Sequence, residues 1–350
     1  MVAQYKINEK VILTDSGGTR NLFVNGAITF NDSDGKTLTI RNTKKTLTPD
    51  FFTNYFHRIQ GATSGYASGG GTAPGGVGVN TIENFPFATD TNSSDVGDLT
   101  VGRFYVAGQS SSTHGYVSGG YVNPSSTDTF YNIIDKFPFS VDANATDVGN
   151  LPRTTGMTTG QSSSTHGHTS GGKNPSLITN ITKFSFAADA DGTDVGDLTV
   201  AREVGAGQSS SENGYTSGGQ TPSKTNVIDK FPFSSDDNAT DVGDLTQARS
   251  YGAGQSSSDN GYTSGGHVPS WTNIIDKFPF SADANATDVG DLTVSRGSSS
   301  SQSSITHGYN SGGQYPFKNE IDKFTFSSDA NATDVGNLIS TPLGGSGQQV

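Results

Sequence analysis

The chain has 350 residues and no cysteine, which excludes disulfide bonds, thiol nucleophiles and thiolate metal sites. Hydrophobic residues make up only 31% while glycine contributes 46 residues, so the chain cannot build a large conventional apolar core. The net charge of -12 argues against a nucleic-acid partner, because phosphates require clustered Lys and Arg.

Residues 1–57 differ from the rest of the chain. They carry seven Lys or Arg and five Asp or Glu, so the acidity belongs to the remainder. We expect strands at residues 11–14, 21–30 and 37–40, followed by a short helix near 49–57. That helix would carry four aromatic side chains: Phe51, Phe52, Tyr55 and Phe56. A β-rich module this small, followed by an aromatic-rich helix, predicts docking to another chain or to the rest of this chain, and we expect it to be the attachment end.

The first ten residues and the hydropathy of the whole chain bear on secretion and on membrane insertion. Residues 1–10 lack the basic start and apolar run of a secretory signal, and no stretch is apolar enough to span a membrane. We therefore expect neither export by the general secretory route nor membrane insertion.

Residues 58–350 consist of six similar repeats. A Gly-aromatic-x-Ser-Gly-Gly motif begins at Gly65, Gly115, Gly167, Gly214, Gly261 and Gly308. Repeats of this length with Gly-rich turns and short apolar stretches are typical of a β-propeller with one blade per repeat. The sequence therefore predicts an all-β fold: a six-bladed propeller behind a small N-terminal module.

One repeat shows the strands of a blade. In residues 249–293 we expect strands at 250–257, 261–266, 273–280 and 288–292, four per blade. The aromatic residue before each double glycine and the Phe-x-Phe pair are expected to pack between blades. Residues 345–348 resemble 252–255, so we expect the C-terminal strand to complete the first blade and close the ring.

The turn between the third and fourth strands repeats as Ser-x-Asp-x-Asn-x-Thr-Asp. Side chains that hydrogen-bond to their own backbone are a sufficient reason for this pattern. The alternative is a calcium site, with six candidate ligands: Asp142, Asn144, Asp283, Asn285, Asp329 and Asn331. No glutamate follows at the spacing of an EF-hand, so we favour the structural turn and expect no cofactor.

Arginine recurs at the links between blades, at Arg58, Arg103, Arg153, Arg202, Arg249 and Arg296. One arginine per blade on the same face would form a cationic ring able to hold an anionic glycan. Arg103, Arg202, Arg249 and Arg296 are binding candidates on this hypothesis. The alternative, which we favour, is pairing with an aspartate inside each blade.

The stretches between the second and third strands are where the repeats differ most. They carry five aromatic candidates for a binding site: Tyr121, Tyr131, Trp271, Tyr315 and Phe317. Divergent loops on a repeated scaffold are where binding usually occurs, and aromatic rings can stack on sugar faces. The alternative is that these loops tolerate change without function.

The repeats resemble two families of propeller. Arginine, a small-residue strand, Gly-Tyr-x-x-Gly-Gly, a hydrophobic strand and a Leu-ended strand resemble the kelch repeat over residues 58–350. The kelch tryptophan is replaced by valine, as at Val242 and Val289. The Asp-rich turns resemble the Asp box of sialidase-type propellers, a structural turn remote from catalysis. Sialidase catalysis would need an arginine cluster, a Tyr–Glu nucleophile pair and an acid, and the scarcity of glutamate leads us to expect no enzyme.

The FPF, DVGDLT and GYxSGG motifs are similar to those of virion proteins from marine bacteriophages, especially phages of cyanobacteria. This resemblance implies a non-enzymatic tail fibre or tail-associated protein, present in multiple copies. Residues 1–57 would bind other virion proteins, and the propeller loops would bind a host surface glycan or protein. The alternatives are a capsid or tail decoration that binds only neighbouring subunits, and a glycan hydrolase that uses Glu203 or Glu212.

Overall fold

The computed structural model describes residues 60–72, 77–123, 128–315, 317–340 and 342–350, together with the backbone of five strands between residues 12 and 47. The chain divides into two compact units, Met1–Arg58 and Ile59–Val350. The predicted short helix and its four aromatic residues lie outside the described residues.

The N-terminal unit contains five strands in two antiparallel sheets. Strands β1 (Ile12–Ser16), β2 (Thr19–Phe23) and β5 (Lys44–Leu47) form one sheet, and β3 (Ala27–Asn31) pairs with β4 (Thr37–Arg41) in the other. The expectation of one strand over residues 21–30 is wrong, because this stretch supplies β2 and β3 of two different sheets. Asn25-Gly26, a favoured turn dipeptide, lies between them in the sequence. Strand β5 was not predicted, because two adjacent lysines break its apolar pattern.

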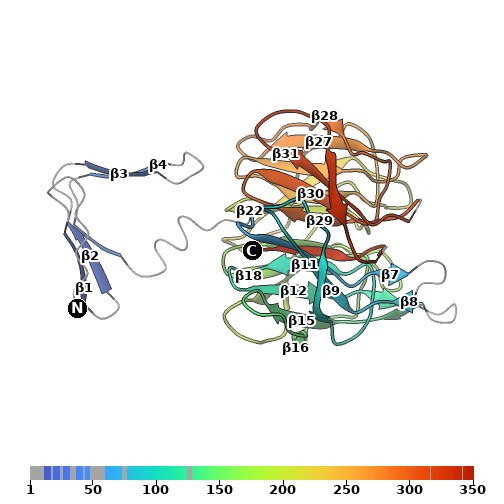
Figure 1. The fold of residues 1–350 in the computed structure, drawn as a ribbon, viewed down its shortest axis with the longest axis horizontal. Coiled ribbons are helices and arrows are strands. Elements are labelled where there is room, and N and C mark those ends of the chain that lie inside the picture. The colour runs from blue at the N-terminus through green and yellow to red at the C-terminus, as the bar shows by residue number, and fades with distance from the viewer. Residues whose placement is uncertain are drawn as a thin grey trace. The chain divides into compact units, whose positions relative to one another are not determined.

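The second unit is a six-bladed β-propeller, as predicted, with a four-stranded antiparallel sheet in each blade (Figure 1). Four strands follow one another outward from the axis in every blade. The innermost strands are β33 (Ser346–Gln349), β11 (Ala107–Ser110), β17 (Thr159–Ser162), β21 (Ala206–Ser209), β25 (Ala253–Ser256) and β29 (Ser300–Ser303). The second strands are β6 (Ser64–Ser68), β12 (His114–Ser118), β18 (His166–Ser170), β22 (Asn213–Ser217), β26 (Asn260–Ser264) and β30 (His307–Ser311).

The two outer strands complete each blade. The third strands are β9 (Thr81–Pro86), β15 (Ile133–Pro138), β19 (Asn180–Ser185), β23 (Val227–Pro232), β27 (Ile274–Pro279) and β31 (Glu320–Thr325). The fourth strands are β10 (Ser94–Asp98), β16 (Thr146–Asn150), β20 (Thr193–Asp197), β24 (Thr240–Asp244), β28 (Thr287–Asp291) and β32 (Thr333–Asn337). Two short hairpins, β7 (Gly71–Thr72) with β8 (Val77–Gly78) and β13 (Tyr121–Val122) with β14 (Thr129–Phe130), extend from the loops of the first two blades.

The double glycine ends the second strand of each blade. Gly265 and Gly266 have φ angles of 64° and 110°, a region that side chains with a Cβ rarely adopt. The second strand predicted over 261–266 therefore stops at Ser264, before the pair. The turn aims the following loop back toward the axis.

The C-terminal strand closes the ring. Strand β33 is the innermost strand of the first blade and pairs antiparallel with β6, Gln348 opposite Tyr66 (Figure 1). The backbone of Val350 also accepts hydrogen bonds from Thr63 and Ser64. Ring closure between the two ends of this unit was predicted from the sequence and is confirmed.

Thin aromatic layers fill the space between blades. Tyr215 of the fourth blade packs on Phe278 and Phe280 of the fifth, with ring centroids 5.5 and 4.8 Å apart, beside the buried Ile228 and Leu245. Layers of this kind recur around the ring, so a small apolar content is enough to hold the blades together.

Buried glutamines join the blades close to the axis. Gln255 Nε2 donates to Ser264 Oγ in its own blade and to the Tyr309 carbonyl in the next, both at 2.9 Å. The other glutamines that bond a carbonyl of the next blade are Gln109, Gln161, Gln208, Gln302 and Gln348. The small polar residues of the Gly-Gln-Ser-Ser-Ser runs, such as residues 254–258, predict a polar lining for an axial channel. Glycines such as Gly207 and Gly254 do line it, whereas the glutamine side chains lie between the blades.

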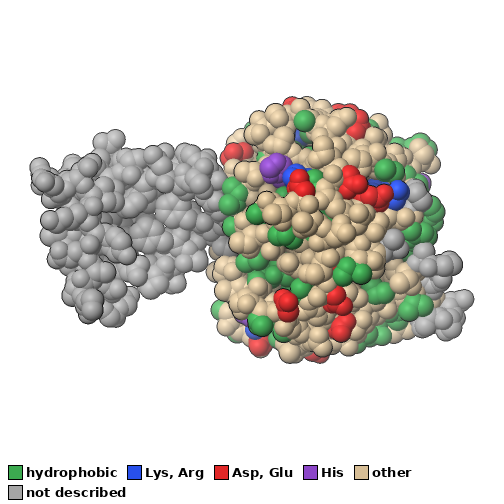
Figure 2. Space-filling view, in the orientation of Figure 1, with side chains coloured by type: hydrophobic (Ala, Val, Ile, Leu, Met, Phe, Trp, Pro, Cys, Tyr) green, Lys and Arg blue, Asp and Glu red, His purple; other side chains and the backbone are tan. Residues whose placement is uncertain are grey.

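The surface reflects the composition. Most of the propeller face in Figure 2 consists of backbone and of side chains that are neither hydrophobic nor charged, with acidic groups scattered among them. In the described part of the chain, no helix is long and apolar enough to cross a membrane.

Candidate functional site

The arginines at the blade links lie inside the blades. Arg103, Arg202, Arg249 and Arg296 are at most 1% exposed, and each forms an ion pair with a fully buried aspartate: Asp135, Asp229, Asp276 and Asp322. The cationic ring on a face of the propeller is therefore wrong for these four side chains. Ion pairing with these aspartates offsets the free-energy cost of removing the guanidinium groups from water.

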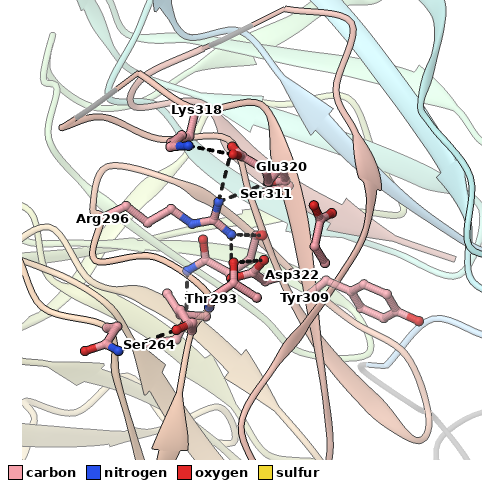
Figure 3. Close-up of polar contacts among 12 residues, drawn as sticks. Ser264, Thr293, Arg296, Tyr309, Ser311, Lys318, Glu320 and Asp322 are labelled. Atoms are coloured by element: carbon pink, nitrogen blue, oxygen red, sulfur yellow. Dashed lines mark hydrogen bonds and ion pairs between the residues drawn. The ribbon is translucent and has the colours of Figure 1, made fainter.

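Figure 3 shows one of these clusters. The guanidinium of Arg296 lies between two carboxylates, 3.0 Å from Asp322 and 4.0 Å from Glu320. Thr293 Oγ1 donates to Asp322 at 2.7 Å, and Lys318 pairs with Glu320 at 2.7 Å. The cluster ties the link between two blades to the third strand, β31.

The remaining arginines do not extend this set. Arg153 is exposed, and Thr155 occupies the position that corresponds to Arg103, four residues after the leucine of the fourth strand. Aligning the repeats on Leu151 and Leu99 would have revealed this two-residue offset. Arg58 lies outside the described residues.

The Asp-rich turns connect neighbouring blades. Asn285 Oδ1 accepts a hydrogen bond from the backbone of Asp244 in the preceding blade at 3.1 Å. Asp283 pairs with Lys230 of the same preceding blade at 2.5 Å, and its neighbours repeat the contact, as in Lys136 with Asp189 at 2.7 Å. Among the described residues, no group of three or more His, Asp or Glu converges as a metal site would require. Contacts between blades are thus made by five of the six candidate calcium ligands: Asn144, Asp283, Asn285, Asp329 and Asn331.

The aromatic loop candidates differ in exposure. Tyr315 is 58% and Phe317 40% exposed, Trp271 and Tyr131 are half-buried, and Tyr121 is buried. Trp271 and Tyr315 come from adjacent blades and stack with ring centroids 4.9 Å apart and planes 14° apart. In the described part of the chain, Tyr131 contacts none of these rings.

Four of the five candidates belong to a continuous series of aromatic rings, which we call the aromatic belt. Neighbouring ring centroids in the belt lie between 4.9 and 6.5 Å apart. In order of contact, its rings are Phe130, Tyr121, Tyr105, Tyr251, Trp271, Tyr315 and Phe317. The belt links loops of the second, fifth and sixth blades.

Sequence reasoning missed Tyr105 and Tyr251, the two rings at the centre of the belt. They follow Arg103 and Arg249 by two residues, in blades on opposite sides of the ring, and meet with centroids 5.9 Å apart. Tyr105 Oη lies 3.3 Å from both Ser298 Oγ and Gln314 Nε2 of the sixth blade. A tyrosine at the same repeat position in two blades was the available signal.

These two tyrosines stand on a ring of strained backbone. One residue per blade has a φ angle between 50° and 62°, and five of the six are not glycine. In chain order, this mouth ring consists of Tyr105, Met157, Val204, Tyr251, Ser298 and Gly344. Each backbone N–H donates to the carbonyl of the preceding member, at 2.5 to 2.9 Å, and the series closes on itself.

The mouth ring surrounds a hollow of about 80 Å³ at one end of the axial channel. Left-handed backbone at non-glycine residues costs free energy and persists where the surroundings enforce it, often at binding sites. All six members of the mouth ring line this hollow, and the rings of Tyr105 and Tyr251 contact each other there, with centroids 5.9 Å apart.

One acidic side chain beside this hollow stands apart from the others. Glu203, next to Val204 of the mouth ring, is 9% exposed, and its Oε2 has no hydrogen-bond partner among the described residues. Burial raises the pKa of its carboxyl, and Lys173 acts in the opposite direction. In the described part of the chain, no ion pair joins Glu203 and Lys173.

No family model matches the chain, and no curated protein matches it.

Proposed function

We propose that the chain is a non-enzymatic binding protein whose propeller holds a surface glycan on the aromatic belt. The observation that carries this proposal is the unbroken contact of seven aromatic rings, which ends in the exposed Tyr315 and Phe317. Aromatic faces pack on the apolar faces of sugar rings, and polar loop side chains bond the hydroxyl groups.

The position of the belt supports an elongated ligand. Tyr121 comes from the second blade, Trp271 from the fifth and Tyr315 from the sixth, so the rings cross the mouth of the channel. A chain of several sugars would contact more of these rings than a single sugar could.

The burial of the recurring arginines supports binding without catalysis. The four recurring guanidiniums that might hold a substrate carboxylate are buried in ion pairs within their blades. Burial and Lys173 shift the pKa of Glu203, and among the described residues no second acid does so, whereas glycoside hydrolysis uses two neighbouring carboxylates.

A place on a virus particle is the second part of this proposal. The repeats resemble virion proteins of marine phages that carry kelch-like propellers, and the N-terminal unit is separate from the propeller. In this arrangement the N-terminal unit attaches to other virion proteins, and the belt meets the host surface.

A glycan array probed with the full chain tests the binding function. We expect binding to a subset of extended glycans, and at least a tenfold loss of affinity for Tyr315→Ala and Phe317→Ala, because each change removes an exposed stacking surface. Val141→Ala, 60% exposed in an outer turn away from the belt, is the matched control and should bind normally. Unchanged binding of the belt variants would refute the proposal.

Immunogold electron microscopy with an antibody to residues 58–350 tests the place on the particle. Label on tail fibres or the tail tip supports host attachment. Label over the head of purified phage particles supports a decoration protein. Absence of label from every particle would refute the proposal that the chain is a virion protein.

A further inference from the structure

Most lysines of the propeller are paired with an acid. The lysines that form ion pairs are Lys136, Lys183, Lys230, Lys277, Lys318 and Lys323. Two others, Lys173 and Lys224, form none within the described part of the chain. Both lie in loops between the second and third strands of their blades, on the side of the ring that carries the aromatic belt.

Lys224 contacts the turn that supplies Trp271 to the belt. Lys224 is half-buried, and its Nζ donates to the Val268 carbonyl of the next blade. Val268 lies in a tight turn that a bridge between His267 and Trp271 closes. The His267 ring packs on Trp271 with centroids 4.7 Å apart, and Trp271 stacks on the exposed Tyr315 at 4.9 Å. A positive charge therefore lies at the exposed end of the belt.

The ammonium of Lys224 has donors to spare. A lysine carries three N–H donors, and among the described residues only the Val268 carbonyl accepts from this one. His267 adds no charge at pH 7, because burial and the charge of Lys224 lower its pKa. Carboxylates accept shorter and stronger hydrogen bonds from an ammonium than neutral groups do. The remaining donors therefore favour an anionic ligand.

The acidic turns of the propeller lie on the other side of the ring. The Asp-rich turns join the third strands to the fourth, at the opposite end of each blade from the belt. Strand β22 has five residues and spans about 17 Å, which exceeds the Debye length of about 8 Å at physiological salt. On the belt side, Glu320 pairs with Lys318, and Glu203 is only 9% exposed. The charge of the Asp-rich turns is thus screened from Lys224.

We propose that Lys224 binds a carboxylate of the glycan held on the aromatic belt, so that the ligand is an acidic polysaccharide built from uronic acids. The inference rests on the proposed glycan function and names the class of sugar. Within one short oligosaccharide, a sugar ring stacks on the belt and a carboxylate reaches Lys224. The four recurring arginines do not supply this contact, because they are buried in ion pairs.

Titration calorimetry at pH 7 with matched pairs of oligosaccharides tests this subsite in the full chain. Oligomers of glucuronic, galacturonic and mannuronic acid are each compared with the carboxyl-reduced counterpart, in which a neutral hydroxymethyl group replaces the carboxylate. We expect at least one acidic oligomer to bind about tenfold more tightly than its reduced counterpart. Lys224→Gln should remove that preference without changing the affinity for the reduced oligomer, and Lys224→Arg should retain it.

Lys230→Gln is the matched control. It makes the same change of net charge in the same blade, at a side chain that pairs with Asp283 of an Asp-rich turn, and it should keep the preference. The comparison on the unaltered chain does not depend on how a variant folds. The inference is overturned if every acidic oligomer binds equally, more weakly or not at all, or if the preference survives Lys224→Gln. Equal loss of the preference in Lys230→Gln would also overturn it. The glycan function fails separately, when no glycan binding depends on Tyr315 or Phe317.

Discussion

One histidine in the third repeat is expected to make the folding stability of the propeller depend on pH. Five repeats have tyrosine before the Ser-Gly-Gly segment, and the third has His168, which is 2% exposed and stacks on Phe233 at 4.9 Å. Burial lowers the pKa of His168 to about 3. An unfolded histidine binds its proton near pH 6.5, so between there and about pH 3 the unfolded state holds more protons. Folding stability therefore falls as the pH drops through this window.

We predict that His168→Tyr makes unfolding less dependent on pH. The tyrosine of the other repeats fits this layer and takes up no proton in this range, so the urea midpoint should fall less between pH 7 and pH 5 than it does for the unaltered chain. The reciprocal change Tyr262→His should increase that fall. An equal loss of stability in the unaltered chain and in His168→Tyr would contradict the assignment.

Within one blade, the buried ion pair stabilises the native arrangement only while both partners are present. The third blade has Thr155 and Thr182 where four of the other blades have arginine and aspartate, and it still forms four strands. Removing one partner elsewhere leaves a buried charge without compensation, which is costly, whereas removing both is often nearly neutral.

We therefore predict that Asp276→Asn destabilises the propeller by about 3–5 kcal/mol, because it leaves the buried Arg249 unpaired. The double variant Arg249→Thr with Asp276→Thr, which copies the third blade, should lose less. Urea unfolding measures both, with Asp283→Asn as a control whose exposed ion pair should cost about 0–1 kcal/mol. A double variant as unstable as the single one would refute this account.

How far the sequence predicts the structure depends on whether a contact repeats from blade to blade. An aromatic ring at the Tyr215 position and a phenylalanine at the Phe278 position recur in all six repeats, so their packing between blades could be predicted and is confirmed. Tyr105 and Tyr251 meet only across the axis, between blades that are not neighbours, and no spacing along the chain indicates that contact. The pairing of Arg249 with an aspartate inside its blade could be predicted, because that aspartate, Asp276, lies in the same repeat.

At the scale of the whole molecule, the ring is held closed by a strand from the far end of the chain. Strand β33 fills the first blade, where its Gln348 bonds the Tyr116 carbonyl of the second blade at 3.2 Å. Without it, β6 would be an unpaired edge beside the axis, and the aromatic layer between the first two blades would lose its inner support. The closure also fixes Gly344, the last member of the mouth ring, through its hydrogen bonds to Tyr105 and Ser298.

Deleting residues 345–350 should therefore open the ring, lower the thermal midpoint of the propeller and abolish glycan binding, although the belt residues remain. Moving the same six residues ahead of residue 63, joined to it by an added Asn-Gly turn, separates the two effects. The moved strand can form a hairpin with β6, because Val350 already accepts a hydrogen bond from Thr63 at 2.6 Å, the bond that closes a two-residue turn. This variant should regain binding, since the mouth ring is complete again. Its thermal midpoint should stay below that of the unaltered chain, because the C-terminal strand no longer ties the last blade to the first. Full recovery of the midpoint would show that filling the first blade, rather than joining the ends, is what stabilises the ring.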